Sequence, residues 1–323
     1  MTLLLGVDGG ATKTVALIAD AGGTVLGAGR SGSSDVHAVA DPAEAVERVA
    51  EAVRQAAAVA GVATSALGPC TFSLCGADWP EDAQLYAVGL ATRLGLDAPP
   101  VVLNDALGAL RAGTPDGVGV SLVIGTGGAI GARGPDGRTW FSGFRLEPSG
   151  AVGLGRSVYD LLLRAEYADA PIPAFQAAAL AALDVSSVEA LVHAVTARGG
   201  LGEQGLARLA AVLLEAEHDG DPQARAIVAS HAAMLAAYVR GAARRVGLAA
   251  TGTTLVVTGG VLRHHCTDLL DGVAREVPGF RLLRASVEPV YGALLGSADV
   301  AGLRLHADHL QATGPDGAFF ATR

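Results

Sequence analysis

The chain has 323 residues, a length that is sufficient for two domains, each with its own hydrophobic core. Half of the residues are hydrophobic and only 17% are charged, and this composition excludes a chain that is mainly disordered. The formal net charge is −9 and the sequence contains no long run of lysine or arginine, so we expect no nucleic-acid partner.

The first residues form a short apolar run that reaches Asp8 without a basic segment before it. We therefore expect neither a signal peptide nor a membrane span at this end. Cys70, Cys75 and Cys266 are an odd number of cysteines without C-x-x-C spacing, a pattern typical of reduced thiols. Together these features predict a cytoplasmic protein that does not bind a membrane.

Residues 3–34 predict a three-stranded antiparallel meander. One apolar run leads to a Gly-rich polar turn, a second run ends at Gly22–Gly23, and a third short run follows. Residues 118–144 repeat this order, first with a Gly/Thr turn and then with a turn at 135–137. Because the run lengths and turn residues are those of β-hairpins, the chain is expected to contain two related units.

Helices are expected after each meander. The Asp41–Pro42 pair, followed by valines at helical spacing, predicts the first helix. Further helices are expected over about 81–95, 106–111 and 221–247 and from about 289, with short strands over 100–103, 254–258 and 280–283. We predict an α/β protein with two domains, residues 1–112 and residues 113–323, whose last helix packs back on the first domain.

The segment from Asp8 to Thr14 is the first candidate phosphate-binding turn. Its glycines let backbone N–H groups approach phosphate oxygens, and Lys13 and the threonine hydroxyls add donors. The β-rich residues that follow predict a strand–turn–strand loop, whereas a Walker loop leads into a helix. An ordinary hairpin turn remains the alternative. Asp8 is a candidate magnesium ligand, through water, or a residue that only stabilises the turn.

Gly125-Thr126-Gly127-Gly128 lies at the matching position of the second meander. Such a turn is weak as a motif when it occurs alone. Two Gly/Thr turns at equivalent places of a repeated unit are a stronger signal. They predict a triphosphate site, because a clamp around a triphosphate needs donors from both sides.

Asp105 comes where a short strand ends and a helix begins. The helix dipole favours a carboxylate at this place, so we expect Asp105 to be ionised near neutral pH. A carboxylate of this kind suits a kinase base, which orients the acceptor hydroxyl and takes its proton late. The alternative is a simple helix N-cap. Gly259–Gly260, after a buried strand, is either a backbone surface for adenosine or a plain strand-to-helix turn.

The segments DGGATKT, LNDA, IGTGG, VVTGGV and PVYGALLGSA occur in this order over nearly the whole chain. With them the sequence resembles the BadF/BadG/BcrA/BcrD ATPase family and, within it, the N-acetylglucosamine kinase branch. The resemblance implies the ribonuclease-H-like fold of actin and hexokinase, with two domains around a cleft. It also implies phosphate transfer from ATP, with Mg²⁺, to the 6-hydroxyl of a sugar, and a homodimer.

The resemblance also assigns residues to the two substrates. Asp105 matches the catalytic base. The residues assigned to ATP are Gly9, Gly10, Thr12, Lys13, Thr126, Gly127, Gly128, Gly259 and Gly260, to which Glu217 and His264 are added. The residues assigned to the sugar, besides Asp105, are Asp35, His37, Gly143, Phe144 and Glu147.

The sugar side departs from the family pattern at two positions. Asp35 stands where the resembling kinases have an asparagine, and Glu147 stands where they have an aspartate. The carboxylates of Asp35 and Glu147 could accept hydrogen bonds from the ammonium group of an amino sugar. We therefore expect either N-acetylglucosamine or unacetylated glucosamine as the substrate.

Two other functions are compatible with the same resemblance. One is an activator ATPase of acyl-CoA dehydratases or reductases, which holds an iron–sulfur cluster with cysteines. The spacing of Cys70 and Cys75 on a buried strand and its exit, with Cys266 on a distant helix, does not favour such a cluster. The other is a sugar sensor without catalysis. Those proteins usually carry an added DNA-binding helix-turn-helix segment, and here the first strand begins almost at once.

Overall fold

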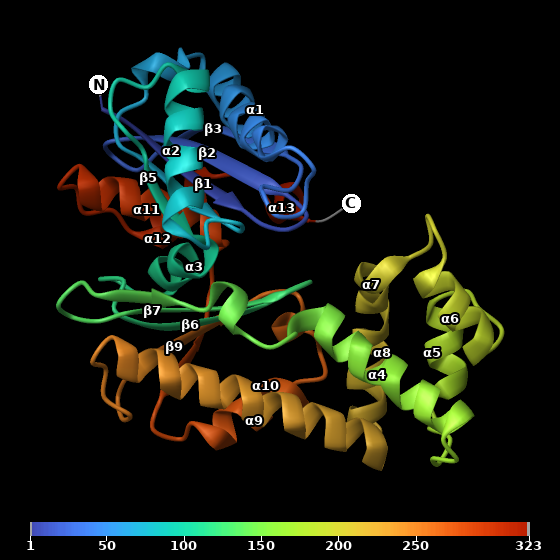
Figure 1. The fold of residues 1–323 in the computed structure, drawn as a ribbon. Helices are drawn as coiled ribbons and strands as arrows, with labels where there is room; N and C mark the ends of the chain where they lie inside the picture. The colour runs from blue at the N-terminus through green and yellow to red at the C-terminus, as the bar shows by residue number, and fades with distance from the viewer. Residues whose placement is uncertain (1, 322–323) are drawn as a thin grey trace.

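The computed structural model describes residues 2–321 and has two lobes, each built around a five-stranded sheet (Figure 1). The strand order is β3-β2-β1-β4-β5 in the first sheet and β10-β9-β6-β7-β8 in the second. In both sheets an antiparallel meander continues into parallel strands. The strands are β1 Leu3–Gly9, β2 Thr14–Asp20, β3 Val25–Ser31, β4 Cys70–Leu74, β5 Val101–Asn104, β6 Gly119–Ile124, β7 Gly128–Arg133, β8 Thr139–Phe141, β9 Thr254–Thr258 and β10 Arg281–Arg284.

Helices follow both meanders, as the turn and capping residues predict. The α-helices are α1 Pro42–Ala60, α2 Pro80–Leu94, α3 Asp105–Gly113, α4 Gly150–Tyr167, α5 Gln176–Ala182, α6 Val188–Thr196, α7 Gly202–Gly205, α8 Leu209–His218, α9 Pro222–Arg245, α10 Asp268–Glu276, α11 Pro289–Val300, α12 Ala307–Thr313 and α13 Gly317–Phe320. Short 3-10 helices are η1 Thr64–Ala66, η2 Gly143–Arg145, η3 Leu206–Arg208 and η4 Val261–Arg263.

The first sheet is buried between two helical layers because its strands are apolar on both faces. Leu5 and Val7 of β1 pack with α1 and α2 in one core cluster. Leu4, one residue away and on the opposite face, packs with α11 and with Phe320 of α13 in another cluster. The end of the chain therefore returns to the first sheet, where Figure 1 shows it in red.

The second sheet contributes Leu122 and Val257 to the largest core cluster, together with residues from α4 to α10. Within the described residues, α9 alone is long and apolar enough to cross a membrane by length and composition. Val228, Leu235 and other residues of α9 belong to the same core cluster as the sheet, as in the core helix of a globular lobe.

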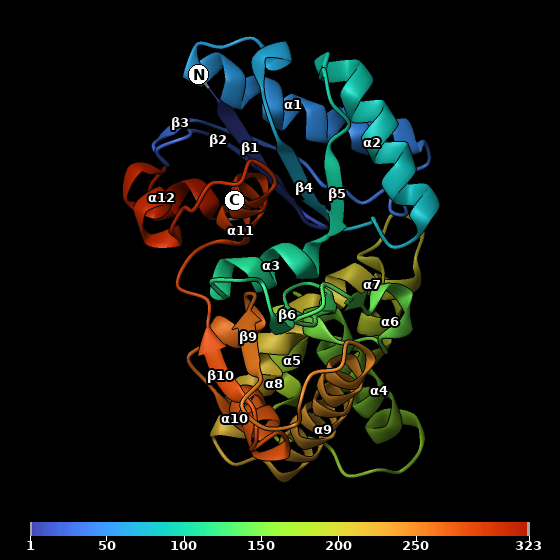
Figure 2. The ribbon, with the colours of Figure 1, turned by 90° about the vertical axis from the view of Figure 1, so that its left-hand side faces the viewer.

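Helix α3 lies between the two sheets, as Figure 2 shows. From the first sheet, the Ser73 hydroxyl accepts the N–H of Gly108 at 3.1 Å and donates to the Asp105 carbonyl at 3.2 Å. From the second sheet, the Ser121 hydroxyl donates to the Ala106 carbonyl at 2.6 Å. Serines of both sheets therefore fix the first turn of α3, which carries Asp105.

The predicted fold is confirmed, including both meanders and the α/β architecture of the actin and hexokinase type. One difference concerns the segment after Gly260, where the short helix η4 comes first and α10 begins only at Asp268. The division into domains at residue 112 falls in the last turn of α3 and stays a proposal.

Candidate active site

A cleft of about 760 Å³ lies between the two lobes. It collects residues that are far apart in the sequence, from β1, the exit of β4, α3, the β6–β7 turn, α4 and the segment after β9. The predicted site residues that line it are Asp8, Gly10, Thr12, Lys13, Asp35, Asp105, Thr126, Gly127, Gly128, Gly143, Phe144, Glu147, Gly259 and Gly260.

Four predicted residues are not among those that line this cleft. Gly9 lies in β1, where a Cβ would meet the Ser34 side chain within 3 Å. His37 is close by, with its Nε2 3.1 Å from Oδ2 of Asp82. Glu217 lies near the end of α8 and faces Arg225 at 3.7 Å, and His264 lies in the loop before α10.

The first glycine turn is a compact β-hairpin loop. The N–H of Gly10 donates to the Lys13 carbonyl at 2.8 Å, and the Thr14 hydroxyl donates to the Gly32 carbonyl at 2.8 Å. The Lys13 ammonium donates to the carbonyl of Phe320 in α13. Burial lowers the pKa of Lys13, while the charges of Glu288 and Asp8 raise it.

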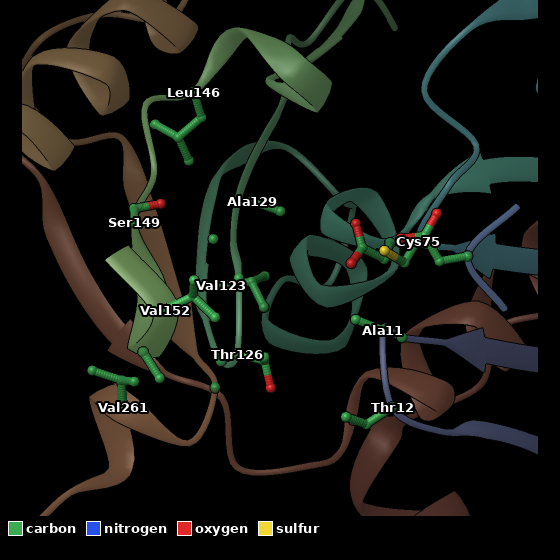
Figure 3. A pocket seen from close by; sticks show the side chains of 18 of the residues that line it. Ala11, Thr12, Cys75, Val123, Thr126, Ala129, Leu146, Ser149, Val152 and Val261 are labelled. Carbon is green, nitrogen blue, oxygen red and sulfur yellow. The ribbon is translucent and has the colours of Figure 1, made fainter. Parts of the chain in front are cut away.

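The second glycine turn is tied to the start of α4. The N–H of Ala151 donates to the Gly125 carbonyl at 2.9 Å, and that of Val152 donates to the Thr126 carbonyl at 3.1 Å. This approach requires glycine at 150, because φ is +71° there and a Cβ would lie within 3 Å of the Gly127 carbonyl. Figure 3 shows Thr126 in the cavity, facing Ala11 and Thr12 of the other turn across the cleft.

Ser149, directly before α4, lines the cleft although it was not among the site residues predicted from the sequence. Its hydroxyl is buried and has no hydrogen-bond partner among the described residues. The side chain does not cap α4. A buried hydroxyl without a partner is costly in a folded protein, so Ser149 is available as a donor to a ligand in the cleft.

Asp105 is the first residue of α3, and Asn104 is the N-cap, whose side chain accepts the N–H of Ala106 at 3.2 Å. The N-cap alternative for Asp105 is therefore wrong. Burial, and next the charge of Asp78, raise the pKa of Asp105 to about 7. The expectation that Asp105 is ionised near neutral pH is also wrong, because its burial, together with the charges of Asp78 and Asp35, outweighs the helix dipole.

Asp8 faces the same region from the end of β1. Burial raises its pKa to about 7, and the charges of Asp105 and Glu288 add to the effect while Lys13 opposes it. Glu288 lines the cleft directly before α11 and pairs with Arg263 at 2.9 Å. Neither Glu288 nor Arg263 was predicted from the sequence.

Asp78 is a further cleft residue that the sequence analysis missed. It follows β4, and its Oδ1 accepts the side-chain N–H of Asn104 at 3.0 Å, which holds it next to Asp105. Burial raises the pKa of Asp78, and Asp35 adds to this while His37 and Arg145 lower it. Asp78 was not predicted because the Gly76-Ala77-Asp78 segment belongs to none of the phosphate- or sugar-binding motifs identified in the sequence.

Aromatic side chains join the two lobes beside Gly143, Phe144 and Glu147, the end of the cleft whose residues the resemblance assigns to the sugar. The rings of Trp79 and Phe144 are stacked with centroids 6.4 Å apart, and His37 meets Phe144 edge-on at 4.9 Å. The Arg145 guanidinium lies over the Trp79 ring at 4.8 Å. Trp79 and His37 belong to the first lobe and the other two residues to the second, so these contacts cross between the lobes.

Gly259 directly follows β9 and lines the cleft. Its φ is +105°, and a Cβ would lie within 3 Å of the backbone of Ile124 in β6. At Gly260 a Cβ would meet nothing within 4 Å. The turn therefore offers open backbone surface toward the cleft, as an adenosine site requires.

The cysteines lie in different parts of the molecule. Cys70 is in β4 and Cys75 follows that strand, while Cys266 lies in the loop before α10 and packs in the core of the second lobe. The expectation that Cys266 lies on a helix is wrong, because the chain forms no regular helix between η4 and α10.

The raised pKa values of Asp8 and Asp105 predict that the ligand-free protein loses stability as the pH rises. Each carboxyl has an ordinary pKa of 3.8 and a folded pKa of about 7, so the unfolded chain releases these protons at lower pH. The free energy of unfolding should therefore decrease as the pH rises from 3.8 to about 7, and it should become constant above about pH 7.

Urea unfolding at a series of pH values measures this effect. Asp8→Asn removes one of the two carboxyls, so the variant should lose less stability than the original chain across the same interval. Equal pH slopes for the two proteins would contradict the prediction.

Comparison with known proteins gives a family match over part of the chain and a shared fold. Residues 5–160 match the model of the BadF/BadG/BcrA/BcrD ATPase family. No curated protein matches the chain. Among solved structures, a provisionally named N-acetylglucosamine kinase from Chromobacterium violaceum is similar, with TM-score 0.69 and 22% identity over 92% of this chain and 99% of that one.

Two further structures share the fold. A provisionally named N-acetylglucosamine kinase from Porphyromonas gingivalis has TM-score 0.66 and 20% identity over 94% of this chain and 100% of that one. A ROK family glucokinase from Streptomyces griseus, in complex with glucose and AMPPNP, has TM-score 0.55 and 20% identity over 92% and 98%. The predicted resemblance of this chain to the BadF/BadG/BcrA/BcrD ATPase family is thus confirmed, with the family match extending over residues 5–160.

Proposed function

We propose that this protein is an ATP-dependent kinase that phosphorylates the 6-hydroxyl of an amino sugar. The observation that carries the proposal is the meeting of two glycine turns and the carboxylate of Asp105 in one cleft between two lobes. A triphosphate clamped from both sides, with an acceptor hydroxyl near a carboxylate, is the arrangement that phosphoryl transfer requires. The donors on the triphosphate are the backbone of the two turns together with Lys13, Thr12 and Thr126.

The cleft also fits a magnesium ion bound with ATP. Asp8 and Glu288 offer carboxylate oxygens, the ligands that Mg²⁺ prefers, and their mutual repulsion favours a cation between them. Bound Mg²⁺ would neutralise negative charge that develops on the phosphates. Asp8 would hold it through water, as expected from the sequence.

Asp105 would act on the acceptor hydroxyl. Its position in the first turn of α3, fixed by Ser73 and Ser121, suits a group that must orient a hydroxyl and accept its proton. A pKa of about 7 lets the carboxyl hold that proton after transfer and release it to water near neutral pH.

The charge of the sugar end supports an amino sugar as the acceptor. Among the described residues that line the cleft, the carboxylates of that end are those of Asp35, Asp78, Asp105 and Glu147. The cationic side chains that line the cleft, Lys13 and Arg263, are near Glu288 at the nucleotide end. An ammonium group would compensate the carboxylates, which favours glucosamine over N-acetylglucosamine.

A cytoplasmic homodimer is part of this proposal. The activator ATPase is the weaker alternative, because Cys70 and Cys266 are buried in the cores of different lobes and do not converge on one cluster. A sensor without catalysis would not need a carboxylate at the junction of the phosphate turns and the sugar end.

Steady-state kinetics with ATP, Mg²⁺ and each of the two sugars tests the proposed substrate. We expect glucosamine to accelerate ADP release with a kcat/KM at least about tenfold above that of N-acetylglucosamine, equivalent to one charge-assisted hydrogen bond. A preference for N-acetylglucosamine would overturn the choice of glucosamine. If neither these sugars nor glucose accelerates ADP release, the kinase proposal itself is wrong.

A further inference from the structure

His264, His265 and Cys266 form a compact group outside the walls of the cleft. Each residue offers one metal-binding atom, and these atoms all lie within 4.8 Å of one another. The group occupies the loop between η4 and α10, with Cys266 buried, His264 half-buried and His265 exposed.

The local structure already orients two of the three side chains. Nδ1 of His264 accepts the backbone N–H of Cys266 at 3.2 Å, which leaves its Nε2 for another partner. The rings of the two histidines are stacked with centroids 4.4 Å apart. The Cys266 sulfur packs at the edge of the core of the second lobe. The three residues therefore bring one metal-binding atom each to within 4.8 Å of the others.

The charge around the group favours a cation. Glu215 and Asp219, at the end of α8, and Asp268, at the start of α10, act on the Cys266 sulfur with negative charge. Asp268 also faces the His218 imidazole at 3.3 Å. Among these residues we find no lysine or arginine pairing with the carboxylates in the described structure.

We propose that His264, His265 and Cys266 bind one thiophilic divalent cation, with Zn²⁺ as the best match. Two imidazoles and a thiolate are zinc ligands, whereas Mg²⁺ takes oxygen ligands and would not compete. Ligand atoms of a tetrahedral zinc site are about 3.3–3.6 Å apart, given bonds of about 2.0–2.3 Å. The observed group, whose atoms lie within 4.8 Å of one another, therefore needs to contract by about an ångström on binding, and water would take the fourth position.

The site lies next to the cleft without being part of it. Arg263, the residue before His264, lines the cleft and pairs with Glu288 at 2.9 Å. A bound ion would hold three consecutive residues of the loop between η4 and α10 and so restrict that loop. This role does not depend on the proposed kinase reaction.

Cobalt substitution of the protein tests the site without reference to activity. After treatment with a chelator, Co²⁺ is added and the spectrum is recorded. We expect one equivalent to bind, with a thiolate-to-cobalt charge-transfer band and the visible bands of tetrahedral Co²⁺, and one equivalent of Zn²⁺ to remove them. Zn²⁺ alone should raise the melting temperature.

Three variants separate the site from chance binding. Cys266→Ser should abolish the charge-transfer band, and His265→Ala, at an exposed side chain, should weaken Co²⁺ binding by at least about tenfold. Cys70→Ser is the matched control, because a serine hydroxyl can keep the bond to the Gly68 carbonyl and should leave the spectrum unchanged. The proposal is overturned if the original chain shows no charge-transfer band, or if His265→Ala binds Co²⁺ as tightly as the original chain.

Discussion

Asp105→Asn is expected to lower kcat for the amino sugar by about 10²–10⁴-fold, the range that general-base catalysis contributes. Asparagine has the same shape and keeps the first position of α3, but it cannot accept the proton of the 6-hydroxyl. The affinity for ATP should change little, because the glycine turns and Lys13 bind the triphosphate in this account. Initial rates of ADP release and a separate nucleotide-binding measurement distinguish the two effects.

Asp97→Asn is a suitable control for this experiment. Asp97 is exposed in the loop before β5, away from the residues that line the cleft, so its replacement should leave both quantities unchanged. Ionisation of the buried Asp105 carboxyl destabilises the folded protein, because its pKa is raised to about 7. The uncharged asparagine avoids this loss, so the variant should be at least as resistant to heat as the original protein at neutral pH. Turnover by Asp105→Asn within a few-fold of the original rate would remove Asp105 from the role of base.

Asp78→Asn is expected to lower kcat/KM for glucosamine by roughly 10- to 150-fold, which corresponds to one hydrogen bond to a charged group. The same variant should lose far less with N-acetylglucosamine, because an acetamido group carries no positive charge. The asparagine oxygen can still accept the Asn104 side-chain N–H, which Asp78 accepts at 3.0 Å, so the fold of this region should be retained. The measurement is the ratio of the two kcat/KM values.

Glu147→Gln is the comparison for Asp78→Asn. Glu147 is exposed at the wall of the cleft, whereas Asp78 is half-buried next to Asp105, so the loss for glucosamine should be smaller in Glu147→Gln. Asp78 is rejected as the group that binds the amine if Asp78→Asn lowers kcat/KM for both sugars by the same factor.

The fold was predictable because its signals are local. Alternating apolar runs and glycine turns define the two meanders, and Asp41–Pro42 and Asp221–Pro222 mark the starts of α1 and α9. The two glycine turns were also predictable as turns, since each is a short motif inside a hairpin. These features need no knowledge of how distant segments pack.

The residues that were missed depend on packing between distant segments. Asp78 reaches Asp105 because β4 and β5 are parallel neighbours, and Glu288 reaches Asp8 because α11 packs back on the first sheet. The pKa of Asp105 was misjudged for the same reason. The helix dipole is a local property that the sequence indicates, whereas burial and the carboxylate of Asp78 are products of the whole fold.

The most direct test of the proposed function is to identify where the phosphate of ATP goes. The protein is incubated with ATP, Mg²⁺ and glucosamine, and the products are followed by phosphorus NMR and mass spectrometry. We predict one hexosamine 6-phosphate formed for each ADP released. Release of inorganic phosphate in its place, with no phosphorylated sugar, would contradict the kinase proposal and favour an ATPase.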